Sequence, residues 1–76
     1  MANHLAREIT KALSGAVGDF IATATVKKNC ELIGTTPDSL TADQLTTLSV
    51  KIEKSVAFFT DDRTASDLAV KVRAMS

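Results

Sequence analysis

The sequence predicts an all-α fold, a small bundle of four helical segments in one domain that spans residues 1–76. Apolar residues recur at intervals of three and four along most of the chain, which is the spacing of helices with one buried face. The only concentrated turn signal is Gly-Thr-Thr-Pro-Asp-Ser at residues 34–39. No stretch alternates apolar and polar residues for long enough to predict a strand. Because the connections are short, we expect successive helices to pack antiparallel.

The first helical region begins after Asn3, whose side chain is suited to cap a helix N-terminus. Its apolar stripe is Leu5, Ile9, Ala12, Leu13, Ala16, Val17, Phe20 and Ala24. Gly15 and Gly18 interrupt it, and each costs about 1 kcal/mol relative to alanine inside a helix. Two alternatives follow. Gly18 ends one helix and Asp19 caps the next, or the unbroken phase of the stripe indicates one helix that bends at the glycines.

Beyond residue 24 the apolar face rotates around the helix. The second stripe is Ala22, Val26, Cys30 and Ile33. Gly34 is placed to end this helix, since the residue after a helix C-terminus often takes a positive φ that glycine adopts at low cost. Pro37 stops any helix from continuing through the turn.

The third helix has the clearest start signal in the chain. Thr41 and Gln44 have the spacing of a capping box, and Leu40 and Leu45 have the spacing of a hydrophobic staple. We expect this helix to run from about residue 42 to 59. Its core stripe is Leu45, Leu48, Ile52, Val56 and Phe59.

The last helix is expected to start at Thr60, Asp61 and Asp62, which offer a cap and negative charge for its first turn. Lys71 and Arg73 suit the negative C-terminal end of its dipole. The core-facing residues are Ala65, Leu68, Ala69, Val72 and Met75.

Charge and hydropathy limit the classes of partner. Nine Lys and Arg residues balance nine Asp and Glu residues, so no net positive charge attracts nucleic acid or an acidic membrane. No apolar run approaches the roughly 18 residues of a membrane-spanning helix. Arg7, Glu8 and Lys11 also interrupt any early apolar stretch of the secretory kind. We therefore expect a cytoplasmic protein with no nucleic-acid or membrane partner.

The polar residues do not form a recognisable catalytic or metal-binding motif. The single cysteine and the single histidine supply too few ligands for a structural zinc site. We expect His4 to be exposed, and Cys30 to act as a small core hydrophobe. The aspartates gather at expected helix starts, where capping and the helix dipole account for them. The expectation is a protein that is not an enzyme and holds no metal or cofactor.

One triplet, Asp38-Ser39-Leu40, lies just before a helix in the middle of the chain. In this respect the chain resembles the acyl carrier protein family. The resemblance implies that Ser39 would carry a phosphopantetheine arm through a phosphodiester. The sequence departs from the family after the serine, where carriers place acidic residues along the helix and this chain has Lys51 and Lys54.

The small core favours an interaction protein over a free-standing domain. Only three aromatic residues are present, all phenylalanine, and domains of this size often gain stability from an oligomer. We expect a homo-oligomer or a subunit of a larger assembly. The candidate interface residues are apolar residues of the last two helices that lie outside the predicted core stripes: Val50, Ala57, Phe58, Val70 and Ala74. The alternative is that the bundle buries Phe58 under its own N-terminal helix.

Overall fold

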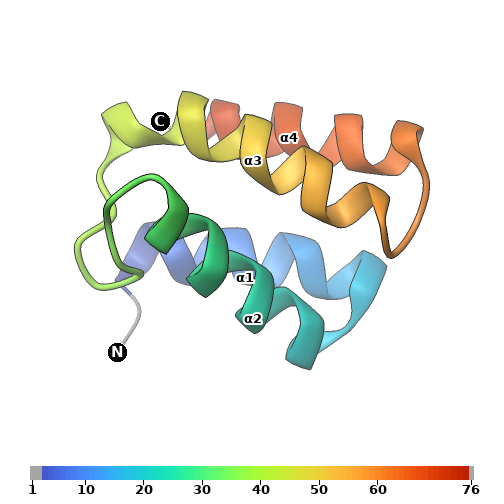
Figure 1. Cartoon of the computed structure of the whole chain (residues 1–76), viewed down its shortest axis with the longest axis horizontal. Helices are drawn as coiled ribbons and strands as arrows, with labels where there is room; N and C mark the ends of the chain where they lie inside the picture. The colour runs from blue at the N-terminus through green and yellow to red at the C-terminus, as the bar shows by residue number, and fades with distance from the viewer. Residues whose placement is uncertain (1–2, 76) are drawn as a thin grey trace.

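The computed structural model describes residues 3–75, and Figure 1 shows their arrangement. The helices are α1 (His4–Val17), α2 (Asp19–Leu32), α3 (Leu45–Ala57) and α4 (Asp62–Ala74), with a short 3₁₀ turn, η1 (Ala42–Gln44), directly before α3. This part of the chain contains no strand. The predicted all-α bundle is confirmed.

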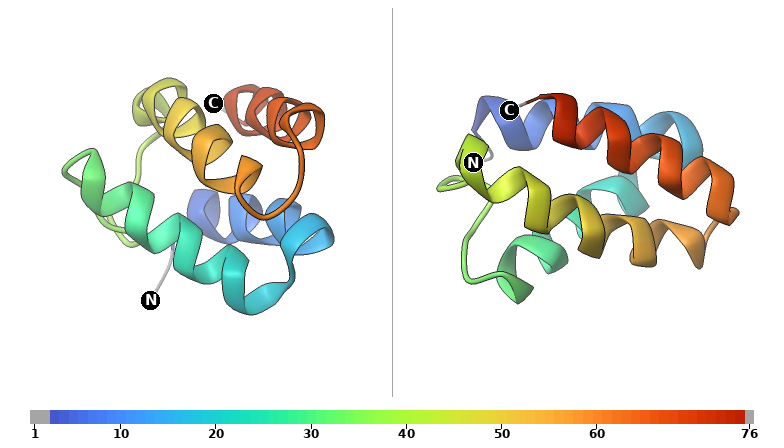
Figure 2. Two further views of the ribbon diagram at one scale, coloured as in Figure 1. Left: turned by 45° about the vertical axis from the view of Figure 1, so that its right-hand side comes forward. Right: turned by 90° about the horizontal axis from the view of Figure 1, so that it is seen from above.

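The four helices form two antiparallel hairpins, α1 with α2 and α3 with α4, which stack on each other (Figures 1 and 2). Helix α2 packs against α3, and α1 packs against α4. The turn between α1 and α2 and the turn between α3 and α4 lie at the same end of the molecule (Figure 1). The long connection between α2 and α3 lies at the opposite end, together with the start of α1 and the end of α4.

The chain breaks between α1 and α2 at Gly18, so the first of the two alternatives is the observed one. Gly18 has φ 86° and ψ 163°, a conformation that glycine adopts without steric cost. Its N–H donates to the Ser14 carbonyl at 2.9 Å, and its carbonyl accepts from the Ala22 N–H at 2.9 Å. Gly18 therefore ends α1 and starts α2, while Asp19 is the first residue of α2 and not its cap.

The break at Gly18 changes which residues of α2 reach the core. Phe20, predicted to lie on the core stripe, is 75% exposed, and Ala16 and Ala24 are exposed as well. That prediction was wrong because the helical phase of α1 does not continue across the break. The second stripe is confirmed: its first three members are buried and the fourth is half-buried, namely Ala22, Val26, Cys30 and Ile33.

Helix α2 ends as the sequence predicts. Gly34 has φ 84°, its N–H donates to the Glu31 carbonyl at 3.1 Å, and the Thr35 N–H donates to the Cys30 carbonyl at 2.9 Å. This pair of bonds is a Schellman motif, which satisfies carbonyls that the helix itself leaves free.

Asn3 has two roles at the opposite end of the bundle. It caps α1, because its Oδ1 accepts from the Ala6 N–H at 3.0 Å. Its Nδ2 also donates to the carbonyls of Leu40 at 2.7 Å and Asp38 at 3.3 Å. Its backbone N–H donates to the Pro37 carbonyl at 2.9 Å. The start of α1 is thus bonded to the connection that leads into α3.

The third helical segment starts at residue 42, as the sequence predicts, but its first three residues form η1, and α3 begins at Leu45 and ends early. The Thr41 N–H donates to Gln44 Oε1 at 3.0 Å within the capping box, and Leu40 and Leu45 are both buried in the core. The helix ends at Ala57, and Phe59 is 57% exposed although the α3 stripe placed it in the core. That prediction failed because helical periodicity does not extend past the last helical residue.

Helix α4 begins at a side-chain cap. Asp61 Oδ1 accepts from the Thr64 N–H at 2.7 Å, and this hydrogen bond holds the pKa of the Asp61 carboxyl below its usual value. Of the predicted core residues, Ala65, Leu68, Ala69 and Val72 are buried and Met75 is half-buried. The predicted core face of α4 is confirmed.

The core is built from small and aliphatic side chains. All four helices contribute, and the largest fully buried apolar side chains are Ile9, Leu13, Leu45, Leu48 and Ile52. All three phenylalanines are exposed. The largest apolar side chains of the chain therefore do not pack in its interior.

Candidate functional site

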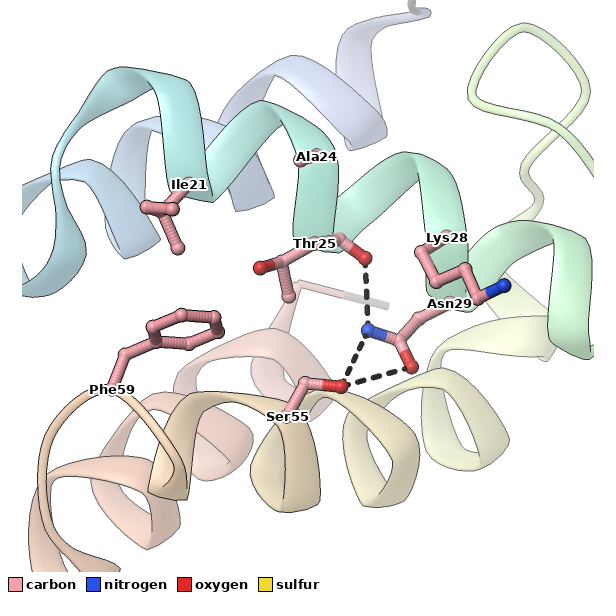
Figure 3. Close-up of a pocket in the computed structure, with 7 residues that line it drawn as sticks. All are labelled: Ile21, Ala24, Thr25, Lys28, Asn29, Ser55 and Phe59. Carbon is pink, nitrogen blue, oxygen red and sulfur yellow. Dashed lines mark hydrogen bonds between the residues drawn. The ribbon is translucent and has the colours of Figure 1, made fainter.

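A groove opens between α2 and α3, close to the end of the molecule that holds the two hairpin turns (Figure 3). Its volume is about 210 Å³. We call it the α2–α3 groove, and it is lined by Ile21, Ala24, Thr25, Lys28, Asn29, Ser55 and Phe59. Apolar side chains form the end near the turns, and polar side chains form the other end (Figure 3).

The polar floor of the groove is held by hydrogen bonds between the two helices. Asn29 is 1% exposed, and its Nδ2 donates to the Thr25 carbonyl at 2.8 Å and to Ser55 Oγ at 3.1 Å. The Ser55 hydroxyl donates back to Asn29 Oδ1 at 3.3 Å. A buried amide with these partners has few alternative positions, so it fixes α2 against α3 at the floor of the groove.

Lys28 lies at the rim of the groove, at the end opposite Phe59 (Figure 3). Its side chain is exposed and makes no hydrogen bond or ion pair with any residue in the range 3–75. The groove therefore offers an apolar surface with one positive charge at its edge. Such a combination suits an apolar side chain that has a carboxylate nearby.

The three phenylalanines gather at the end of the molecule beside this groove. Phe20 is the second residue of α2, and Phe58 and Phe59 follow α3, so all three lie in or next to the two turns at one end of the molecule in Figures 1 and 2. Phe58 is 88% exposed. We call this set of three residues the aromatic end. Exposed aromatic side chains are uncommon on surfaces that stay in water and are enriched at interfaces.

The five interface residues predicted from the sequence differ in exposure and in their place in the bundle. Phe58 is exposed at the aromatic end, so the alternative in which it packs under α1 is wrong. Val50, Val70 and Ala74 are exposed, but Val50 and Val70 lie near the middle of α3 and α4, and Ala74 is the last residue of α4. Ala57 is half-buried and packs against the core.

Sequence periodicity did not identify Phe20 and Phe59 as exposed residues, and it gave no indication of the groove. A local signal was present for Phe20: on a helix that begins at residue 19, it falls two residues before Ala22 and so about 200° away from the buried face. No comparable signal existed for the groove, because the residues of its two walls that lie closest in sequence, Asn29 and Ser55, are 26 positions apart.

The three residues considered for chemistry belong to different elements of the fold. His4 is exposed at the start of α1. Cys30 is buried in α2, and burial, with a smaller effect of the neighbouring Glu31 carboxylate, raises the pKa of its thiol. Ser39 is exposed in the connection before α3, and its N–H donates to the Thr36 carbonyl at 3.0 Å. No group of three His, Cys, Asp or Glu side chains within residues 3–75 is arranged to hold a metal ion.

No helix in the described part of the chain has the length and apolar character needed to cross a membrane. Comparison with models of protein families, with curated protein sequences and with solved structures finds no match to this chain.

Proposed function

We propose that this chain is a small, non-catalytic protein-interaction module of the cytoplasm that associates with itself or serves as a subunit of a larger assembly. The observation that carries the proposal is the aromatic end beside the α2–α3 groove. The three phenylalanines there are exposed in a domain whose core is otherwise aliphatic. Burying a phenylalanine side chain contributes about 1.5–3 kcal/mol, so leaving all three in water forgoes stability that a partner would supply.

Replacing Phe58 with aspartate tests the proposal. Phe58 is almost fully exposed, so the variant should keep the circular dichroism spectrum and the unfolding midpoint of the wild type. Its association should weaken by about tenfold or more, because a charge would be buried in an apolar contact. Light scattering and sedimentation over a concentration series would measure the change in self-association. Co-purification from a native lysate would measure the binding of other subunits.

Val50→Asp is the matched control, since it places the same charge on an exposed position near the middle of α3, away from the turn that carries Phe58. We expect it to leave association unchanged. A wild-type protein that is monomeric at all concentrations and retains no partner would overturn the proposed function. If Val50→Asp alone weakened association, the interface would instead lie on the exposed side of α3.

The carrier resemblance makes a separate prediction, which rests on Ser39. This serine is exposed and precedes α3, as a modified serine would need to be. The first turn of α3 carries no acidic residue, however, and carrier proteins place acidic residues along this helix. We therefore expect a broad-specificity phosphopantetheinyl transferase with coenzyme A to leave the intact mass unchanged. A carrier protein treated in parallel is the control, and a pantetheine adduct lost in Ser39→Ala would replace our proposal with the carrier function.

A further inference from the structure

The α2–α3 groove ends at Phe59, and the residue before it in the chain, Phe58, has the most exposed of the large apolar side chains among residues 3–75. A cavity of about 150 Å³ accommodates a benzene molecule, so the 210 Å³ groove is large enough for one phenyl ring. Phe58 is 88% exposed and adjoins Phe59, which lines the groove. Each copy of the chain therefore carries both an apolar groove and an exposed ring beside it.

Charged side chains of opposite sign lie beside these two features: Lys28 at the groove, and Asp62, which Arg63 follows in the chain, at the aromatic end. Lys28 stands at the rim of the groove, away from Phe59 (Figure 3). Asp62 starts α4, four residues after Phe58, at the aromatic end. Both side chains are exposed, and neither makes a hydrogen bond or ion pair with a residue in the range 3–75. Asp61, by contrast, is already engaged as the cap of α4.

A two-fold axis between two copies would let the ring of each copy meet the groove of the other, and the negative charge near each ring meet the positive charge at the rim of the other groove. In such an isologous interface, residue i of one copy meets residue j of the other, and the second contact repeats the first. We infer that two copies of this chain form a dimer in which Phe58 of each copy enters the α2–α3 groove of the other and Asp62 of each copy meets Lys28 of the other.

This inference rests on the proposed function and specifies its partner as a second copy of the chain. The absence of net charge removes the general repulsion between copies. The domain exposes only 4484 Å² in all. A stable interface covers about 800 Å² of each partner, a large share of so small a surface, so we expect a reversible dimer in the range of weaker complexes.

Charge reversal tests the proposed pairing. Lys28→Glu and Asp62→Lys each place two like-charged contacts in the homodimer, and each should raise the dimer dissociation constant by about tenfold. Mixing the two variants in equal amounts should restore dimerisation. In the mixed dimer, one contact pairs the introduced glutamate of the first variant with the introduced lysine of the second, and the other contact is the original Lys28–Asp62 pair. Sedimentation from about 10 µM to about 1 mM would cover the range expected for weak complexes.

Lys11→Glu is the matched control, because it changes the net charge as Lys28→Glu does but lies on the exposed side of α1. Circular dichroism of each variant confirms folding.

The inference is supported if both reversals weaken the dimer, the mixture recovers it and Lys11→Glu does not alter it. If the wild type dimerises but neither reversal matters, the inference is wrong and the proposed function stands. A monomeric wild type that binds another protein, and loses that protein in Phe58→Asp, overturns the dimer inference but not the proposed function. A monomeric wild type without any partner overturns both the inference and the proposed function.

Discussion

Replacing Ile52 with alanine is expected to lower the free energy of unfolding by about 3 kcal/mol, because it leaves a cavity among buried side chains. Ile52 is fully buried in α3, within the core cluster to which all four helices contribute. A domain of this size has a total stability of about 4–11 kcal/mol. The variant should therefore lose between about a quarter and three quarters of that stability, and its urea midpoint should fall sharply.

Phe58→Ala is the matched comparison for Ile52→Ala. It removes a larger apolar side chain, yet the side chain is exposed, so the expected loss of stability is below about 0.5 kcal/mol. Urea unfolding of both variants at a low protein concentration, where self-association makes no contribution, would measure the difference. If Phe58→Ala destabilised the domain as much as Ile52→Ala, the phenylalanine would belong to the core and the interface proposal would fail.

Replacing Asn3 with alanine is expected to cost about 2 kcal/mol, more than a helix cap alone. A cap typically contributes about 1 kcal/mol. The additional loss comes from the Leu40 and Asp38 carbonyls, which would lose the donor at 2.7 Å and 3.3 Å. Because Leu40 adjoins the start of α3, the variant should also loosen the connection between α2 and α3. Amide hydrogen exchange across residues 35–44 would detect that loosening.

Asn3→Asp separates the two roles of this residue. Aspartate still accepts a hydrogen bond from the Ala6 N–H and suits the positive end of the helix dipole. It has no amide group to donate to the two carbonyls. We expect its stability to fall between that of the wild type and that of Asn3→Ala. If the aspartate variant were as stable as the wild type, the bonds to the connection would contribute nothing.

The features that could be predicted from sequence are those formed within one or two turns of the chain. Four such features each join residues no more than five positions apart: the Asn3 cap, the helix end at Gly34, the capping box at Thr41 and the cap at Asp61. Backbone geometry brings such residues together in any helix end of that type, whatever surrounds it. The apolar stripes of α3 and α4 were predictable for a related reason, since the buried members of each lie within a single uninterrupted helix; Phe59, placed on the α3 stripe, lies beyond the end of that helix and is exposed.

The candidate site and the attachment of α1 to the connection before α3 both depend on contacts between distant parts of the chain. Asn29 meets Ser55 across 26 positions at the site, and Asn3 reaches Leu40 across 37 at the other end of the bundle. The sequence indicated that Gly18 was suited to a break, but not whether the chain would break there. The exposure of Phe20 and Phe59 and the groove between α2 and α3 became evident only from the packing of the helices. A helical pattern defines which residues share a face, whereas exposure depends on which neighbouring helix covers that face.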